Sequence, residues 1–330
     1  MSEDSKDKKS DDPDSWMDDL DEEPEEDASE SVSATQIVND VTLKGVPALK
    51  GMLAEMTIIP VNATEEERDV GYSNPSMLPL VGAVIGMGLM IFIWIISIVE
   101  DVTGAMVWPI FGLATIMASA LIFKFAFLAD LMNFGGELFP KMSKGPVPLG
   151  GIALAIFCIA ATVAIYLGLY AFAGTQGMGL VVGITEVCVL NAMVCTRAFV
   201  GDKINKTGVA MSTAITMVSV IMITVVWMLL TGNWDVMFIV DAAAAGVISI
   251  VGGFLIGFLT NRVLGYVPDT AAGASVELTR ATLMGVIMFL VMALRGRSQP
   301  GPPRHPNPFH LHSGSPWPML RASLPRAGGK

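Results

Sequence analysis

The chain has 330 residues, of which 52% are hydrophobic and 15% are charged, and its formal net charge is -11. Apolar residues gathered into long runs exclude an ordinary soluble domain. The acidic balance gives no basis for a nucleic-acid partner. About half of the acidic residues fall within the first 30 positions, so the net charge describes one end of the chain rather than the whole surface.

Residues 1–32 form this acidic segment, which contains the run DDPDSWMDDLDEEPEED. Such a run repels itself and buries almost nothing, so it is predicted to be disordered. It is interpreted either as a solubilising tail or as a docking segment for a basic partner. It lacks the basic region followed by an apolar region that marks a secretory signal peptide.

Residues 33–76 are predicted to form a cytoplasmic or interfacial segment. Between Ser33 and Met56 the apolar residues recur at mixed spacings of three and four. This pattern predicts an amphipathic helix at the membrane surface, either continuous or broken at Pro47. Thr64 precedes three glutamates and is expected to be the N-cap of a short helical turn or to lie in a loop.

Seven apolar runs follow, and their lengths are close to the roughly 20 residues with which a helix crosses a bilayer. They predict an all-α, polytopic integral membrane domain over residues 77–294, with about seven transmembrane helices. Glycines in the first and sixth runs predict close packing between helices. The runs are 77–99, 105–128, 151–173, 179–197, 209–231, 236–260 and 279–294, and the glycines are Gly82, Gly86, Gly88, Gly252, Gly253 and Gly257.

The distribution of basic residues predicts the orientation. The loops after the first, third and fifth runs contain no Lys or Arg, whereas basic residues lie in or beside the loops after the second, fourth and sixth. By the positive-inside rule, the even-numbered loops and the N-terminus are cytoplasmic, and the protein is placed in the cell membrane. The basic residues are Lys124, Lys141, Lys144, Arg197, Lys203, Lys206, Arg262 and Arg280.

The cysteines and histidines argue against zinc, haem or imidazole chemistry in the membrane. Cys158, Cys188 and Cys195 fall inside predicted spans and are expected to pack as small apolar residues. All three histidines belong to residues 295–330, so the membrane domain has none for zinc, haem or a histidine base. That Pro- and Arg-rich segment is predicted either to be a disordered tail or to come from a frameshift or a mispredicted gene end.

Two acidic residues lie within predicted spans, where charge is costly and therefore a candidate for function. Glu186 lies near the middle of the fourth run, and Asp241 lies near the outer end of the sixth. They support one alternative, a small-solute or ion transporter. The other interpretation of Glu186 is a structural partner for a Ser, Thr or Asn of a neighbouring helix.

Two predicted cytoplasmic segments, 124–150 and 262–280, combine carboxylates, basic residues and glycines. This combination is what magnesium-dependent phosphate chemistry needs: carboxylates hold the cation, Lys and Arg neutralise phosphoryl oxygens, and glycine lets backbone N–H groups approach. The candidate residues are Lys124, Asp130, Asn133, Glu137, Lys141, Lys144, Arg262, Asp269, Glu277 and Arg280.

Four ordered fragments resemble the cobalamin synthases, the adenosylcobinamide-GDP ribazoletransferases. EMTIIPV and MLPLVGAVIGMGL resemble the opening of that family, FLADLMNFGG its Asp-rich motif, KMSKGPVPLGGIALAI its Met-Lys-Asp phrase, and RVLGYVPDTAAGASVELTR its closing segment. Of the three aspartates in the Asp-rich motif, only Asp130 matches. Ala126 and Asn133 replace the other two, and Lys124 replaces the histidine.

The resemblance implies a transferase that joins α-ribazole, or its 5′-phosphate, to adenosylcobinamide-GDP and releases GMP. It implies Mg²⁺ as the cofactor, with Asp130 and Asp269 as ligands and Glu137 or Glu277 as a further ligand or base. It implies phosphate contacts from the basic residues Lys141, Lys144, Arg262 and Arg280. The expected partners are the corrinoid nucleotide, ribazole, membrane lipid and other cobalamin-biosynthesis proteins. A catalytically inactive relative that serves as a scaffold is the remaining alternative.

Overall fold

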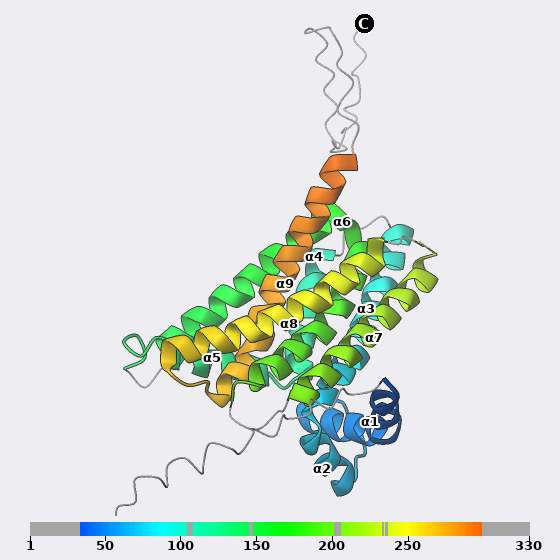
Figure 1. Ribbon diagram of the computed structural model, residues 1–330. Coiled ribbons are helices and arrows are strands. Elements are labelled where there is room, and N and C mark those ends of the chain that lie inside the picture. The colour runs from blue at the N-terminus through cyan, green and yellow to red at the C-terminus, as the bar shows by residue number, and fades with distance from the viewer. Residues whose placement is uncertain are drawn as a thin grey trace, which may run out of the picture.

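A computed structural model describes residues 34–103, 108–144, 148–200, 206–232, 234 and 237–298, and all regular structure in these ranges is helical. The predicted tails lie outside these ranges, apart from the last turn of the final helix. The helices, shown in Figure 1, are α1 (Ala34–Met56), α2 (Glu65–Ser73), the short 3₁₀ helix η3 (Pro75–Met77), α3 (Leu78–Thr103), α4 (Trp108–Ile122), α5 (Ala126–Leu138), α6 (Leu149–Arg197), α7 (Lys206–Thr231), α8 (Met237–Leu264) and α9 (Asp269–Ser298).

The described helices are those of a membrane-embedded protein. Five stretches are long and apolar enough to cross a bilayer: Pro75–Thr103, Leu149–Ala171, Gly177–Arg197, Lys206–Thr231 and Ala242–Leu264. A sixth results if the bent pair α4 and α5 is counted as one span. The run 279–294, predicted as a seventh span, lies on α9 and is not among them. The side chains of Met288 and of residues 290–294 lie outside the described residues, so this run is described only in part.

The second part of α6 is the centre of the bundle. α6 contains the third and fourth predicted runs, joined across a break at Gly174, whose φ of 67° is in the left-handed region. The part from Met178 to Thr196 is buried along its whole length, whereas less than a third of the part from Leu149 to Ala171 is buried. A helix that is apolar on all sides is stable only when neighbours cover it. Those neighbours are α3, α7, α8 and α9 (Figure 1).

Two glycines explain how closely α3 and α8 approach this central helix. A Cβ atom on Gly82 would overlap the backbone of Glu186, and one on Gly253 would overlap the backbone of Ala192. The close packing predicted for these glycines is therefore confirmed. Gly88 differs, because a Cβ there would meet nothing within 4 Å.

α1 and α2 form a helical hairpin at one end of the bundle (Figure 1). α1 continues through Pro47 without a break. Thr64 caps α2 as predicted: it accepts a hydrogen bond from the Glu67 N–H, and Glu67 accepts one from the Thr64 N–H, which is a capping box. Lys50 of α1 donates to Glu67 at 2.6 Å, and this hydrogen bond is the main reason why the pKa of Glu67 lies below its usual value.

The predicted run 105–128 is not one straight helix, because the chain turns by 85° between α4 and α5. The N–H of Phe125 donates to the Ala120 carbonyl and that of Lys124 to the Leu121 carbonyl, the pattern of a Schellman motif. This motif needs a left-handed residue after the helix. Lys124 adopts a φ of 56° where glycine is usual. Its Nζ donates to the Glu55 carbonyl at 2.7 Å and ties the bend to α1.

The left-handed conformation of Lys124 predicts that a glycine at this position is more stable than an alanine. Both Lys124→Gly and Lys124→Ala lose the hydrogen bond to Glu55, but only alanine keeps the strain of the left-handed conformation. We expect the glycine variant to be the more stable by about 1 kcal/mol, the reverse of the order inside a helix. Denaturant titration of both variants in detergent measures the difference. An alanine variant as stable as the glycine variant would contradict the left-handed assignment.

Candidate functional site

One face of α9 carries a row of polar residues and one glycine. Asp269, Gly273, Glu277 and Arg280 are separated by steps of four, four and three residues, the spacing that places residues on the same side of a helix. The row begins at the exposed Asp269 in the first turn and ends at Arg280, which is buried in the middle of the bundle. It leads from the end of the bundle that carries α1 and α2 into the interior.

Asp130 of α5 meets this row at its glycine. The half-buried Asp130 carboxylate packs directly against Gly273, where a Cβ atom would overlap it. Arg197, the last residue of α6, interacts electrostatically with both Asp130 and Asp269, without a direct salt bridge to either. These residues from α5, α6 and α9 form what we call the Asp130–Arg197–Asp269 cluster.

Arg197 is the residue of this cluster that the sequence analysis did not assign to the site. It served only to orient the protein, although its position at the end of a span places it where a polar substrate could arrive. A second signal is its spacing. Arg197 lies eleven positions after Glu186 on α6, and Arg280 lies eleven positions after Asp269 on α9. Since the two helices are antiparallel here, Glu186 can lie beside Arg280 while Arg197 lies near Asp269.

Glu137 is close to the start of α9, but both of its carboxylate oxygens already accept hydrogen bonds. Tyr266 donates to one at 3.3 Å and Thr270 to the other at 3.2 Å. The negative charge of Glu137 raises the pKa of Tyr266 above its usual value. Glu137 therefore joins the end of α5 to the turn before α9.

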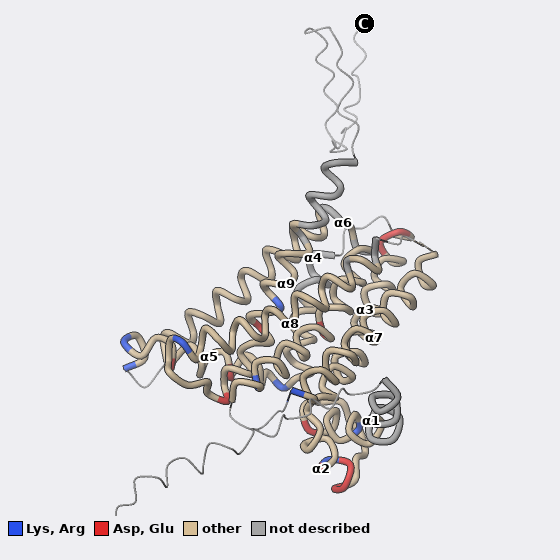
Figure 2. The backbone as a smooth tube through the Cα atoms, viewed as in Figure 1, with Lys and Arg blue, Asp and Glu red and all other residues tan. Residues whose placement is uncertain are grey.

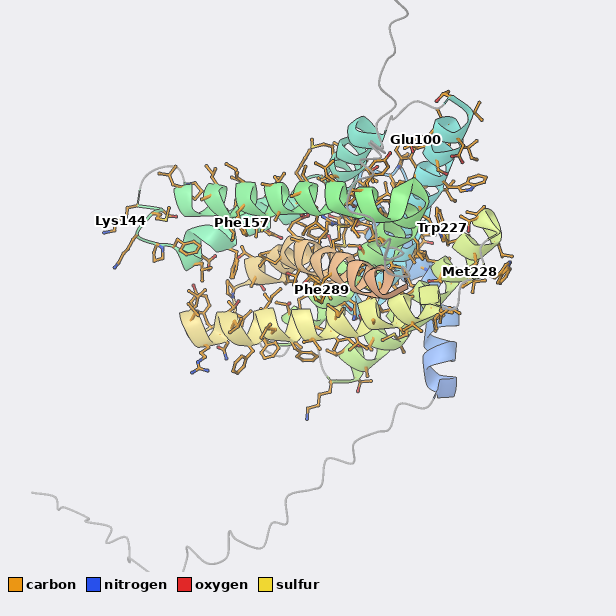
Figure 3. The ribbon with its side chains drawn as sticks, turned by 90° about the horizontal axis from the view of Figure 1, so that it is seen from above. Glu100, Lys144, Phe157, Trp227, Met228 and Phe289 are labelled. Atoms are coloured by element: carbon orange, nitrogen blue, oxygen red, sulfur yellow. The ribbon has the colours of Figure 1, made fainter. Side chains whose placement is uncertain are left out.

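The predicted phosphate-binding residues Lys141, Lys144 and Arg262 are exposed. Lys144 lies at the outer edge of the bundle in Figure 3. The cation whose charge acts on Asp130 is Arg197. Among the described residues, Arg197 therefore acts on Asp130 where one of these three basic residues was expected.

A second polar group lies deeper in the bundle, and Arg280 belongs to it. The expectation that Arg280 lies in a cytoplasmic loop is wrong, because α9 begins at Asp269 and carries Arg280 into the interior. Arg280 donates to Glu186 at 3.0 Å, to Ser119 at 3.2 Å and to Glu277. Ser119 also donates to Glu186, at 3.0 Å. Glu186 thus has the kind of structural partner proposed for it, and an arginine as well.

Other residues with predicted roles lie apart from both groups. The side chain of Asp241 falls outside the described residues. Cys158, Cys188 and Cys195 are free thiols buried in the bundle. The described charges are also unevenly distributed: Lys and Arg lie mostly toward the end that carries α1, α2 and α5, and Glu100 and Asp101 lie at the opposite end (Figures 2 and 3).

The carboxylates of the cluster suit one kind of magnesium site. Among the described residues, no group of three or more His, Cys, Asp or Glu side chains could hold a metal ion. Mg²⁺ often binds through only one or two carboxylates, and substrate phosphates and waters supply the remaining oxygens. Asp130 and Asp269 could provide such a pair, with Arg197 beside them. The residues present therefore fit an ion that arrives with a phosphate, rather than one held by protein alone.

No family model, curated protein or solved structure matches the chain, so the resemblance to the cobalamin synthases stays a prediction.

Proposed function

We propose that the chain is a membrane-bound transferase of the cobalamin synthase type, which joins α-ribazole or its 5′-phosphate to adenosylcobinamide-GDP and releases GMP. The observation that carries the proposal is the contact of Asp130 with Gly273 beside Arg197 and Asp269. Asp130 and Gly273 come from fragments 127–136 and 262–280, which both resemble that family. Each fragment alone is a weak signal, and their meeting at one end of the bundle supports a shared site.

A third fragment, 141–156, packs against the same region. A Cβ atom on Gly151 would overlap the backbone of Met132, so the start of α6 lies against α5 one turn or less from Asp130. Met132 and Gly151, 19 positions apart, and Asp130 and Gly273, 143 positions apart, are thus in direct contact. A common reacting centre requires such convergence, whereas three unrelated loops would not need it.

The proposed reaction is a phosphoryl-type transfer. An oxygen of ribazole attacks the phosphorus bonded to cobinamide, a new O–P bond forms, and the bond from that phosphorus to the bridging oxygen breaks. GMP leaves with the bridging oxygen, and the proton of the attacking hydroxyl passes to a carboxylate of the cluster. A bound Mg²⁺ would neutralise charge on the phosphoryl oxygens. Arg197 would contact the pyrophosphate through its planar guanidinium.

The proposed site faces the cytoplasm, where both soluble substrates are found. Its support is the gathering of described Lys and Arg residues at the end of the bundle that carries the cluster (Figure 2). Under the positive-inside rule that end is cytoplasmic, in agreement with a cell-membrane protein whose N-terminus is inside.

The transporter alternative receives less support from the geometry. Glu186, its central residue, uses one carboxylate oxygen for Ser119 and the other for Arg280. A transport site must release such a residue to its solute, which would leave the Arg280 charge buried. Solute flux that disappears in a Glu186→Gln variant would reverse this preference.

The test is turnover by the purified full chain in lipid nanodiscs, supplied with adenosylcobinamide-GDP, α-ribazole and Mg²⁺. We expect release of GMP in equal amount with the joined corrinoid product. We expect no turnover in EDTA and a loss of at least about 100-fold in Arg197→Gln. Folded wild-type protein that releases no GMP would refute the enzyme and favour the scaffold alternative.

A further inference from the structure

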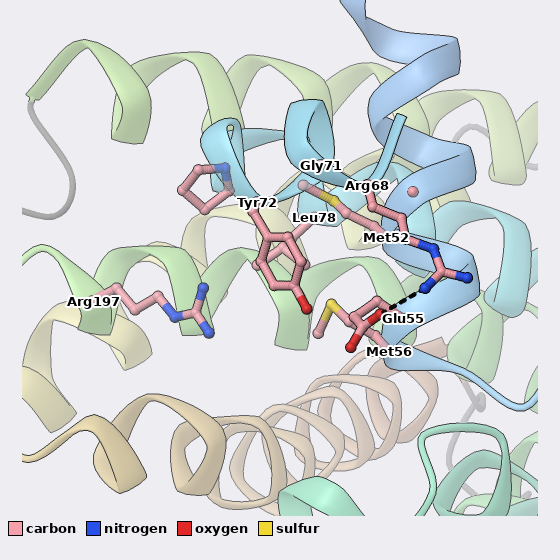
Figure 4. A pocket seen from close by; sticks show the side chains of 10 residues that line it. Met52, Glu55, Met56, Arg68, Gly71, Tyr72, Leu78 and Arg197 are labelled. Atoms are coloured by element: carbon pink, nitrogen blue, oxygen red, sulfur yellow. Dashed lines mark ion pairs between the residues drawn. The ribbon is translucent and has the colours of Figure 1, made fainter. Parts of the chain in front are cut away.

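A cavity of about 140 Å³ lies between the α1–α2 hairpin and the bundle (Figure 4). Met52 and Met56 of α1 and Leu78 at the start of α3 give it an apolar wall. Tyr72 of α2 and Arg197 of α6 also line it. The cavity therefore has an apolar wall and, facing it, the cationic side chain of Arg197.

Among the charged groups of the cavity, Glu55 is already paired. Its carboxylate is 4.0 Å from Arg68. Tyr72 also donates a hydrogen bond to it, and this contact raises the pKa of Tyr72 above its usual value. The negative charge of Glu55 is thus paired with Arg68 and Tyr72 of the α1–α2 hairpin itself.

Arg197 differs from these groups. Its side chain forms no hydrogen bond or salt bridge with the residues that the structure describes, although Asp130 and Asp269 act on it electrostatically. Figure 4 shows its guanidinium directed into the cavity from the end of α6. A guanidinium carries five N–H donors in a planar fork that matches two oxygens of a phosphate. This half-buried cation has donors to offer a ligand.

The position of the cavity relates it to the membrane surface. It lies where the first apolar span begins, at Pro75 and Leu78, and where another ends, at Arg197. α1, which forms one wall, exposes Val46, and Ile58 just after it is half exposed. Apolar residues exposed on an interfacial helix favour contact with lipid. The cavity is therefore expected at the depth of the lipid phosphates in the bilayer.

We propose that this cavity binds the phosphate group of an amphiphile, with the phosphate on Arg197 and the adjoining apolar carbons against Met52, Met56 and Leu78. A bilayer phospholipid is the source that the position favours, and a soluble phosphate ester with an apolar group shares the chemistry. Such a ligand would hold the α1–α2 hairpin against the bundle. The inference goes beyond the proposed transferase: it concerns the Arg197 guanidinium when no pyrophosphate substrate occupies it, and it does not require that any reaction takes place.

The test is binding to the purified, delipidated full chain in detergent, without any corrinoid. Native mass spectrometry would count bound molecules of dioctanoyl phosphatidic acid, dioctanoylglycerol and phenyl phosphate. We expect one phosphatidic acid to bind and dioctanoylglycerol, which lacks the phosphate, not to bind. Binding of phenyl phosphate in preference to the lipid would support the same phosphate chemistry with a soluble source. Equal binding of phosphatidic acid and dioctanoylglycerol, or no binding of any probe, would overturn the proposal.

Variants locate the bound phosphate. Arg197→Gln should weaken phosphatidic acid binding by at least about tenfold, because it removes a charge-assisted contact. Arg197→Lys should recover only part of the affinity, since it keeps the charge but not the planar fork. Lys206→Gln, an exposed residue at the start of α7, is the matched control and should change nothing. Arg68→Gln is a second cavity variant should Arg197→Gln not fold. It leaves the Glu55 carboxylate of the cavity without its cation and should weaken phosphatidic acid binding by charge repulsion. Equal affinity in the wild type and in both cavity variants would place the lipid elsewhere.

Discussion

Replacing Arg280 with methionine is expected to lower the free energy of unfolding by about 3–5 kcal/mol. The side chains of Arg280 and Glu186 are only 6% and 2% exposed. Removing the arginine takes away the charged partner of Glu186 in an apolar interior, although Ser119 still donates to it, and also deprives Glu277 of its ion-pair partner. An unpaired buried charge costs far more than a lost surface contact.

The measurement is denaturant titration of purified protein in mixed micelles, with two reference variants. Arg68→Met breaks the exposed pair with Glu55, whose side chains are 49% and 45% exposed, and should cost about 0–1 kcal/mol. The double variant Glu186→Gln with Arg280→Met removes both buried charges. It should recover the part of the loss that comes from Glu186, because the pair is desolvated and the Arg280 Nε has no hydrogen-bond partner among the described residues. The part that comes from the unpaired Glu277 should remain. A cost for Arg280→Met no larger than that for Arg68→Met would show that the pair is not buried in the folded protein.

The sequence predicted the helices better than their connections, and the reason is physical. A segment that crosses lipid must form a helix, because only then are its backbone polar groups hydrogen-bonded. Long apolar runs therefore predict helices well, and the runs 77–99 and 209–231 match α3 and α7 closely. The bend after Ile122 could not be found in this way. Its left-handed residues are Lys124 and Phe125 rather than glycine or proline, so the local sequence carries no breaker signal.

The candidate site was predictable in its residue types but not in its pairs. Asp130 and Asp269 were named because carboxylates in a basic, glycine-containing segment are typical of phosphate chemistry. Arg280 was predicted to lie with them in a loop, because the charged residues of 262–280 interrupt the apolar pattern of the helix that begins at Asp269. Its contact with Glu186, 94 residues away in the chain, depends on the packing of α6 against α9. No local pattern encodes that contact, although the equal spacing of acid and base on the two helices is consistent with it.

The fit between Asp130 and Gly273 provides the second large expected effect. If the proposed transferase is correct, Asp130→Asn should lower kcat/KM by about 100-fold or more, because the amide cannot accept a proton or balance positive charge as the carboxylate does. Gly273→Ala keeps every charged group but puts a methyl group where the carboxylate now lies. The carboxylate must move, and a displacement of that size costs about 100-fold in a positioned reaction.

Gly88→Ala is the control that separates positioning from the general effect of a helical glycine. A Cβ at Gly88 meets nothing within 4 Å, so this variant should keep full activity and gain about 0.5–1 kcal/mol of stability from reduced chain entropy. The comparison is informative because the two substitutions are chemically identical and differ only in what the new methyl group touches. Gly273→Ala with unchanged turnover and folding would mean that the Asp130 carboxylate has freedom to move without consequence. Asp130 would then be a packing residue of the α5–α9 contact, and the reacting centre would have to be sought elsewhere.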